Sequence, residues 1–317
     1  MRKKLRVGVI GAGHLGRHHA RIYHELEETT LVGICDTDPS KKEIAQTYGA
    51  SFWTKHRDLI GQVDAVSIAT PTSEHFRVAK DFLEAGIHVL IEKPITLKIE
   101  DADMLIALAR KRNCALQVGH IERHNPALKR IEKIAKNIRF LEIHRLGPFT
   151  DRIKDCGVVL DLMIHDFDIV MKLIKSKIKD YDGVGIAVLT PYEDLANVRI
   201  KFENGAVADI TASRLTPEAQ RKIRIFQPDA YISLDYQSQK ANIYTKSLFG
   251  IKQEVIDIEK AEPLKEELRY FADGILSGKS PGNPDEAARN ALAFALDVIE
   301  VIQENHRLGL KALGKKV

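Results

Sequence analysis

Cysteine is scarce in this chain of 317 residues, which contains three cysteines at wide and irregular spacing. Cys35, Cys114 and Cys156 form no CxxC pair and no zinc-type spacing, which excludes a disulfide framework and predicts free thiols in a reducing compartment. No apolar run approaches the roughly 18 residues that a transmembrane helix needs. Internal repeats and low-complexity segments are also lacking.

The chain has no marked excess of one charge, since its formal net charge is +4. Basic residues cluster at both ends, within residues 2–6 and 306–317, so the body between them is slightly acidic. A nucleic-acid-binding protein needs a basic stripe on its body, so that class is disfavoured. The opening MRKK resembles a signal peptide only superficially, because Arg6 interrupts the apolar stretch and no small-residue cleavage site follows. We expect a cytoplasmic protein that begins with a strand.

The composition, 44% hydrophobic and 29% charged, is that of an ordinary globular protein, and the length predicts roughly two domains. Over the first 120 residues, short β-rich runs alternate with amphipathic stretches. We predict strands at residues 5–10, 30–35, 65–69, 88–91 and 115–118, and helices at 14–26, 39–48, 74–85 and 99–112. Asn113 suits a left-handed helix cap. Such alternation predicts βαβ units and a parallel sheet.

The pattern changes near Glu122, where we place the domain boundary, giving domains of residues 1–122 and 123–317. We predict helices at 126–136, 160–174, 264–276 and 286–305, a strand at 139–146, and successive strands from 183 to 258. Asn204-Gly205 between two strand-like runs is a strong hairpin signal. We therefore expect an α/β protein: a Rossmann domain followed by an α+β domain with an antiparallel meander.

A glycine-rich motif follows the first strand and opens the first helix; it reads Gly11-Ala12-Gly13-His14-Leu15-Gly16. This G-x-G-x-x-G in a βαβ context predicts a dinucleotide site. Gly11 permits the tight turn, Gly13 lets backbone amides approach a pyrophosphate, and Gly16 lets the helix pack on the sheet. The positive end of the helix would face the phosphates.

Asp36 ends the next strand and decides the cofactor. Its carboxylate would accept hydrogen bonds from both adenosine ribose hydroxyls and would repel a 2′-phosphate. That repulsion is on the order of 4 kcal/mol per charge pair as an upper figure. Asp38 adds negative charge, whereas Lys41 and Lys42 lie close enough to favour caution. We predict NAD, with NADP less favoured.

Three further motifs resemble the glucose–fructose oxidoreductase / inositol dehydrogenase / rhizopine-catabolism (Gfo/Idh/MocA) family. They are Glu92-Lys93-Pro94, the loop Ala69-Thr70-Pro71 with His75, and the block Gly157, Leu160, Asp161, His165 and Asp168, which resembles G-x-x-L-x-D-x-x-x-H-x-x-D. The resemblance implies a Rossmann domain and a second domain with an open, mostly antiparallel sheet. It also implies that Thr70, Pro71, His75, Glu92 and Lys93 join the glycine loop, His14 and Leu15 included, at the cofactor.

Family resemblance further implies an active site in the cleft between the domains and oxidation of a secondary alcohol of a sugar or cyclitol, or the reverse reduction. The exposed face of the second sheet often makes dimers or tetramers in such proteins. We therefore expect a homodimer or homotetramer, a small sugar or nucleotide-sugar substrate, and neither nucleic acid nor a membrane as partner.

The catalytic residues can also be interpreted from their chemistry. Asp161, His165 and Asp168 stand at i, i+4 and i+7, so they share one helix face. His165 suits a general base near neutral pH. Lys93 would hydrogen-bond the same substrate oxygen and stabilise negative charge as it builds.

Other residues of these motifs have supporting roles in our interpretation. Asp161 would orient His165 or bind a neighbouring hydroxyl. Pro94 would hold the turn that aims Lys93, for which a cis peptide is one solution, and Glu92 would position Lys93 or the loop. We expect no metal: the alternatives, at Asp161/His165/Asp168 or between His120 and His124, are less favoured. His18, His19 and His24 are assigned to the surface or to local packing.

For the substrate, residues 119–126 resemble a G-x-x-x-R-F-N-P stretch of members that act on UDP-activated amino sugars, with His124 in place of Phe. Arg123 and Asn125 are thus candidate sugar or phosphate contacts. Arg145 and Arg152, beside the loop 146–152, are candidate diphosphate contacts, with surface ion pairs as the alternative.

Three hypotheses for the function stay open. They are oxidation of C3 of a UDP-N-acetylhexosamine, oxidation of an unphosphorylated sugar or cyclitol, and a non-catalytic NAD-binding regulator. The last is disfavoured because such regulators lose the Lys or the D-x-x-x-H residues, which this chain retains at Lys93, Asp161 and His165.

Overall fold

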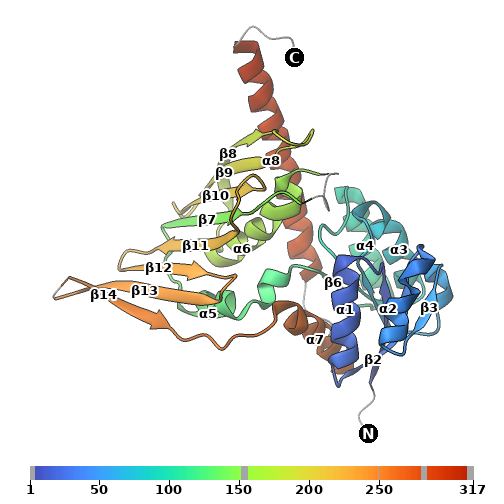
Figure 1. The fold of residues 1–317 in the computed structure, drawn as a ribbon. Coiled ribbons are helices and arrows are strands. Elements are labelled where there is room, and N and C mark those ends of the chain that lie inside the picture. Colours follow the sequence, from blue (N-terminus) through green and yellow to red (C-terminus); the bar gives the residue numbers. More distant parts are fainter. Residues whose placement is uncertain (1–3, 151–155, 249, 280–283, 313–317) are drawn as a thin grey trace. The chain divides into compact units, whose positions relative to one another are not determined.

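The computed structural model describes residues 4–150, 156–248, 250–279 and 284–312, which form two compact units (Figure 1). The first unit comprises Met1–Ile121 and Glu262–Asn290, and the second comprises Glu122–Ala261 and Ala291–Val317. The expected boundary at Glu122 adjoins the end of the first segment. Residues 262–290 belong to the first unit, whereas the expected division put them in the second domain.

The first unit holds a six-stranded parallel sheet in the order β3-β2-β1-β4-β5-β6, as the βαβ pattern predicted. Its strands are β1 (Leu5–Ile10), β2 (Thr29–Cys35), β3 (Ser51–Trp53), β4 (Ala65–Ile68), β5 (His88–Ile91) and β6 (Leu116–Val118). Its helices are α1 (His14–Glu25), η1 (Pro39–Lys41), α2 (Lys42–Thr47), η2 (His56–Leu59), α3 (Thr72–Glu84), α4 (Ile99–Arg112) and α7 (Pro263–Leu276). Asn113 caps α4 in the left-handed conformation, as predicted. The three-residue β3 was missed.

Helix α7 belongs to the first unit because its apolar face packs there. Leu268 and Phe271 are fully buried in the same cluster as Ile22 and Tyr23 of α1. Each large apolar side chain buried in this way stabilises the fold by about 1.5–3 kcal/mol. The carboxyl ends of the parallel strands, with the loops that follow them, then carry the residues of the candidate site.

The second unit holds an eight-stranded sheet in the order β14-β13-β12-β11-β7-β10-β9-β8, visible as a row in Figure 1. Its strands are β7 (Phe140–Leu146), β8 (Ile178–Ile186), β9 (Leu195–Phe202), β10 (Val207–Ser213), β11 (Gln220–Phe226), β12 (Ala230–Asp235), β13 (Lys240–Ser247) and β14 (Gly250–Ile256). The predicted β9–β10 hairpin is confirmed, with Gly205 at φ +80°. The simple meander is wrong at one point: β7 inserts between β11 and β10 and pairs with β10 in parallel.

The helices of the second unit are η3 (Ile121–His124), which starts at the unit boundary, α5 (Pro126–Ile134), η4 (Val159–Met163), α6 (Ile164–Ile174) and α8 (Pro284–Ala312), within which the two units meet in the sequence. The predicted helix at 160–174 is present, but its first turn, η4, is a π-helix. Phe294 of α8 packs edge-on against Phe167 of α6, with ring centroids 4.7 Å apart. The core of this unit therefore includes the helix that carries His165.

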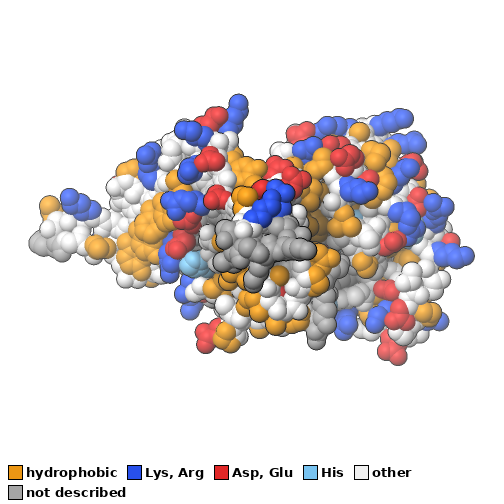
Figure 2. Space-filling model, turned by 90° about the horizontal axis from the view of Figure 1, so that it is seen from above, with side chains coloured by type: hydrophobic (Ala, Val, Ile, Leu, Met, Phe, Trp, Pro, Cys, Tyr) orange, Lys and Arg blue, Asp and Glu red, His pale blue; other side chains and the backbone are white. Residues whose placement is uncertain are grey.

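No helix in the described part of the chain combines the length and the apolarity needed to cross a bilayer. Figure 2 shows Lys and Arg side chains interspersed with Asp and Glu over the face that it draws. Charge of one sign is not gathered into a stripe on that face.

Candidate active site

The glycine-rich loop between β1 and α1 has the backbone geometry of a phosphate-binding turn. Gly11 has φ +90°, and a Cβ added to Gly16 would lie 1.7 Å from the carbonyl oxygen of Gly11. At Gly13, by contrast, a Cβ would meet nothing within 4 Å. No side chain caps the first amides of α1, and His14 and Leu15 on that turn are exposed. The loop thus leaves space at Gly13, beside the first turn of α1, where a pyrophosphate would bind.

Asp36 lies at the end of β2, as predicted, and is tied to this loop. Its Oδ2 accepts a hydrogen bond from the Ala12 amide at 2.6 Å, and its Oδ1 accepts one from the Asp38 amide at 2.9 Å. Because a carboxylate offers about four lone pairs, each oxygen can still accept a ribose hydroxyl. Lys41 forms an ion pair with Asp38 at 3.7 Å, which reduces its availability for a 2′-phosphate.

The loop after β4 carries Thr70, Pro71 and, on α3, His75. The Thr70 hydroxyl is buried and has no hydrogen-bond partner among the described residues, so it has spare capacity for a ligand. His75 is 1% exposed, with Nδ1 2.9 Å from the Pro94 carbonyl and Nε2 3.0 Å from the Thr70 carbonyl. The ring therefore lies between the carbonyls of two loops, and a neutral ring donates its one N–H to one of them. This geometry favours a positioning role for His75, and the direct cofactor contact stays a prediction.

The turn after β5 carries Glu92, Lys93 and Pro94, and the Lys93–Pro94 peptide is cis, as anticipated. Glu92 is buried, and its Oε1 lies 3.0 Å from Nε2 of His19. Burial alone would raise the pKa of Glu92, but the hydrogen bond and charge of His19 and the charge of Lys93 bring it below its usual value. Glu92 thus acts on its neighbours as a carboxylate. Lys93 is half-buried.

In the second unit, Asp161 lies half-buried on η4, and His165 lies on α6 with 8% of its surface exposed. A π-turn is frequent at functional sites, and here it places Asp161 one turn before His165. The predicted common face of Asp161, His165 and Asp168 is altered by this turn. Asp168 is also committed elsewhere, because it receives the guanidinium of Arg123.

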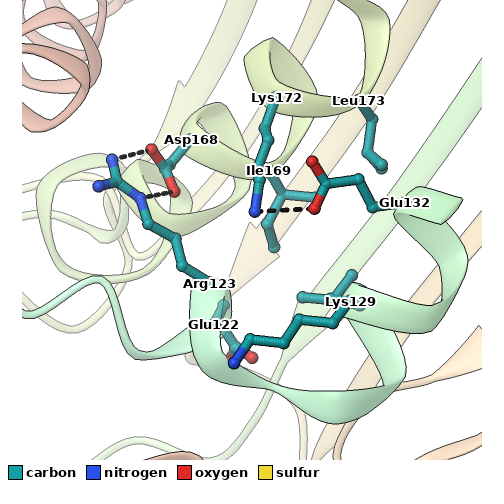
Figure 3. A pocket seen from close by; sticks show the side chains of 9 residues that line it. Glu122, Arg123, Lys129, Glu132, Asp168, Ile169, Lys172 and Leu173 are labelled. Atoms are coloured by element: carbon teal, nitrogen blue, oxygen red, sulfur yellow. Dashed lines mark hydrogen bonds and ion pairs between the residues drawn. The ribbon is translucent and has the colours of Figure 1, made fainter. Parts of the chain in front are cut away.

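Arg123 does not stand free for a substrate phosphate. Its Nε donates to Asp168 Oδ2 at 2.7 Å and its Nη2 to Oδ1, as the two dashed lines in Figure 3 show. The small cavity drawn there, lined also by Glu132 and Lys172, has a volume of about 20 Å³. That volume holds roughly one water molecule and no sugar. The arrangement supports the ion-pair interpretation of Arg123.

Asn125 and Arg145 are likewise structural. Asn125 caps α5 by accepting from the Ala127 amide at 3.0 Å, and its own N–H groups donate to Glu122 and to the Tyr236 carbonyl. Both N–H groups of its amide are thus engaged within the protein, and the predicted substrate contact stays a prediction. Arg145 is 4% exposed and makes three hydrogen bonds to Asp166.

Arg145 is held as a cation by its surroundings. Burial lowers the pKa of Arg145, but electrostatic attraction to Asp166, Tyr236 and Glu122 outweighs burial. The pKa of Arg145 therefore lies well above its usual value. The guanidinium also lies 5.2 Å from the ring centroid of Tyr236. Arg145 thus forms a buried ion pair, which favours the alternative to the predicted diphosphate contact. Arg152, the remaining candidate, lies outside the described residues.

A set of contacts that was not predicted holds the residues at the start of η4. The Val158 amide donates to the Glu193 carbonyl at 2.9 Å, and the Val159 amide donates to the Glu193 carboxylate at 3.2 Å. Arg214 donates to the Cys156 carbonyl at 3.1 Å and to buried Asp194 at 2.6 Å. No local sequence pattern predicts these contacts, because the partners are 20 to 58 residues apart. Among the described residues, no three His, Cys, Asp or Glu side chains form a metal-binding group.

Two family models match the sequence. Residues 5–120 match a model described as an oxidoreductase family with an NAD-binding Rossmann fold, and residues 137–233 match the GFO/IDH/MocA C-terminal domain. Together the two matches extend over both units and over well more than half of the chain.

Individual relatives agree with the family models. The UDP-N-acetylglucosamine 3-dehydrogenase of Acidithiobacillus ferrooxidans is 38% identical over 302 residues, which cover 93% of this chain and 96% of that protein. A solved structure of that enzyme has a TM-score of 0.89 and covers 95% of this chain and 99% of its own. The NAD-dependent scyllo-inositol 2-dehydrogenase of Bacillus subtilis is 28% identical and covers 89% of each chain.

Proposed function

The chain belongs to the GFO/IDH/MocA family of NAD-binding oxidoreductases, and on that premise we propose that it oxidises the C3 hydroxyl of a UDP-N-acetylhexosamine. The observation that carries the substrate is the 38% identity, over 93% of the chain, to a UDP-N-acetylglucosamine 3-dehydrogenase. Inositol dehydrogenases share 25% to 30% identity with this chain, so an unphosphorylated cyclitol or sugar is the second candidate.

The first unit supplies the features that fit NAD. The open space at Gly13, the uncapped start of α1 and the unpartnered Thr70 hydroxyl suit a pyrophosphate and its ribose. The Asp36 carboxylate suits the two adenosine ribose hydroxyls and disfavours the 2′-phosphate of NADP. Bound NAD would supply the hydride acceptor. His75 would act indirectly by holding the Thr70 and Pro94 loops together.

Catalysis, in this proposal, falls to Lys93, His165 and Asp161. Loss of hydride from a carbinol carbon requires removal of the hydroxyl proton, and His165 is the proposed base. The Lys93 ammonium would donate a hydrogen bond to the same oxygen and stabilise its developing negative charge. Asp161 would bind a neighbouring sugar hydroxyl or orient His165.

The diphosphate needs another site, because Arg123 and Arg145 are committed to carboxylates. We propose the open cavity of about 450 Å³ in the second unit that is lined by Leu146, Arg221 and Lys222. Its volume lies within the range of ordinary ligand sites. Arg221 donates to the Leu146 carbonyl at 2.6 Å, so its guanidinium is already oriented at this cavity. We also propose that the chain forms a homo-oligomer, which light scattering after gel filtration would measure.

The experiment is to incubate the purified protein with NAD and a panel of UDP-N-acetylglucosamine, UDP-N-acetylgalactosamine, myo-inositol, scyllo-inositol and free hexoses. NADH absorbance and product mass are followed together. Loss of two hydrogens confined to the UDP-sugars supports the proposal. Turnover confined to inositols or free sugars selects the second candidate and removes the diphosphate site.

Lys93→Ala tests the mechanism, since NAD binding by this variant can be measured separately by calorimetry. Binding without turnover is the expected result. Turnover by this variant would overturn the role of Lys93. If the unaltered protein binds NAD but oxidises none of the alcohols in the panel, the result favours a non-catalytic regulator.

A further inference from the structure

His19 occupies an unusual place for a residue of the cofactor-binding helix. It lies on α1, is fully buried, and points away from solvent into the layer between α1 and the sheet. Its Nδ1 is 2.6 Å from the Ser67 hydroxyl on β4, and its Nε2 is 3.0 Å from Glu92 Oε1, 73 residues along the chain. The sequence analysis assigned His19 to the surface or to local packing. These contacts place it directly behind the Lys93 turn instead.

The Glu92 carboxylate is confined as well as bonded. A Cβ added to Gly119 would lie 3.0 Å from Cδ and from both carboxylate oxygens of Glu92. The carboxylate therefore fills the space between His19 on one side and the Gly119 backbone on the other. Because Glu92 directly precedes Lys93, fixing this carboxylate also fixes the backbone from which Lys93 projects.

Several titratable groups surround this carboxylate. His19 and Tyr23 belong to α1 and His75 to α3, while Lys93 follows in the same turn; Glu267 of α7 lies near Tyr23. Tyr23 and Glu267 are buried, and burial raises the pKa of Tyr23, so its phenol is neutral. His19 makes a hydrogen bond to Glu92.

We infer that His19 is a positioning residue for Lys93: it holds Glu92 as a buried carboxylate, which fixes the turn from which Lys93 projects and places a negative charge beside it. The inference rests on the proposed catalytic role of Lys93. A buried carboxylate without a donor would take up a proton, because burial disfavours the charged form. The Lys93 ammonium would then lose its neighbouring negative charge.

Ser67 lets this arrangement tolerate either charge state of His19. When the ring is neutral, Nε2–H donates to Glu92 and the Ser67 hydroxyl donates to Nδ1. When the ring is protonated, Nδ1–H donates to the hydroxyl oxygen instead, because a serine hydroxyl can both donate and accept. The bond to Glu92 is kept in both cases.

Three variants and one control test the inference. His19→Leu removes the donor to Glu92, and His19→Gln keeps an N–H near the Nε2 position without a titrating ring. Glu92→Gln removes the charge while keeping the shape, so it serves if His19→Leu folds poorly. His24→Leu is the matched control, because His24 is exposed on the same helix and contacts Tyr48.

We expect His19→Leu and Glu92→Gln to lower kcat on the order of tenfold to a hundredfold, the effect of losing a hydrogen bond to a charged group. KM for the alcohol and affinity for NAD should change far less. The pH profile of kcat should also shift in both variants, because the carboxylate charge beside the Lys93 turn is lost. His19→Gln should recover most of kcat, and His24→Leu should match the unaltered protein.

Infrared difference spectra between pH 6 and pH 9 supply a readout that needs no turnover. In His19→Leu we expect the carbonyl band of a protonated carboxyl, which disappears when Glu92→Gln is added. Absence of that band, or an unshifted kcat profile in both His19→Leu and Glu92→Gln, would overturn the inference. If Lys93→Ala is itself fully active, the proposed function fails first, whereas the infrared band still reports on His19 and Glu92.

Discussion

Replacing His124 by phenylalanine should make the second unit less sensitive to acid. His124 is 8% exposed at the end of η3, and burial, followed by the positive charges of Lys129, Arg123 and Lys172, lowers its pKa to about 3. The folded protein therefore keeps the ring neutral at pH values at which the unfolded chain, with an ordinary value of 6.5, takes up a proton.

The magnitude follows from the two pKa values. Because the pKa is depressed in the folded state, the stabilisation is complete above pH 6.5 and is lost as the pH falls toward 3. The loss amounts to about 1.4 kcal/mol at pH 5.5 and about 2 kcal/mol at pH 5.0, and it levels off near about 5 kcal/mol below pH 3. A phenylalanine at this position takes up no proton and escapes the loss.

Amide hydrogen exchange is the suitable assay, because the most protected amides of β7 and α6 report the opening free energy of this unit alone. We would measure the opening free energy of the unaltered protein and of His124→Phe at pH 8.0, 6.5, 5.5 and 5.0. Subtracting one value from the other at each pH cancels the contributions of the other titrating groups. Lys129→Gln, which removes one of the opposing positive charges, should show a smaller acid loss. A difference that stays constant with pH, or a His124 ring resonance that titrates near pH 6.5, would refute the reasoning.

Three other predictions test the cofactor loop and the buried ion pair. Asp36→Ala should lower the preference for NAD over NADP, measured as the ratio of kcat/KM values, on the order of tenfold; an unchanged ratio would contradict the role of Asp36. Gly13→Ala should leave the melting temperature unchanged, because its Cβ meets open space, and it should weaken NAD binding. Gly16→Ala should lower the free energy of unfolding by about 3 kcal/mol or more, because its Cβ would lie 1.7 Å from a backbone oxygen. Equal stability of the two variants would count against this distinction. Arg145→Met should cost about 3–5 kcal/mol by leaving Asp166 buried without its cation; an unchanged melting temperature with a raised KM for a UDP-sugar would restore the diphosphate interpretation.

Much of the first unit was predictable because its signals are local. Each strand of the parallel sheet is a short buried run next to an amphipathic helix, and the glycine loop needs positive φ and close approach at fixed spacing. Asn113 as a left-handed cap and the cis bond before Pro94 also depend on one or two residues. Such features are encoded by neighbours in the chain and survive without knowledge of the fold.

Contacts between distant segments were not predictable in the same way. The apolar periodicity of 264–276 predicted a helix, but nothing in it says that Leu268 and Phe271 pack on α1. The bond from His19 to Glu92 joins residues 73 positions apart. Likewise, the strand pattern of 139–146 is compatible with either neighbour order, and the insertion of β7 between β10 and β11 follows from pairing across the whole sheet.

The carboxylate partners of Arg123 and Arg145 could not be predicted for a related reason, and these partners lie next to the proposed base. Arg145 binds Asp166, the residue after His165, and Arg123 binds Asp168, which lies about one turn further along α6. Each guanidinium makes a bidentate contact with its carboxylate. Because these two contacts lie at different angles around α6, they fix the rotation of the helix about its own axis as well as its position. His165 therefore projects from a helix whose orientation does not depend on bound substrate. We therefore expect Arg123 and Arg145 to hold the helix that carries the proposed base, with Asp168, the last residue of the motif, and Asp166 as their anchors on α6.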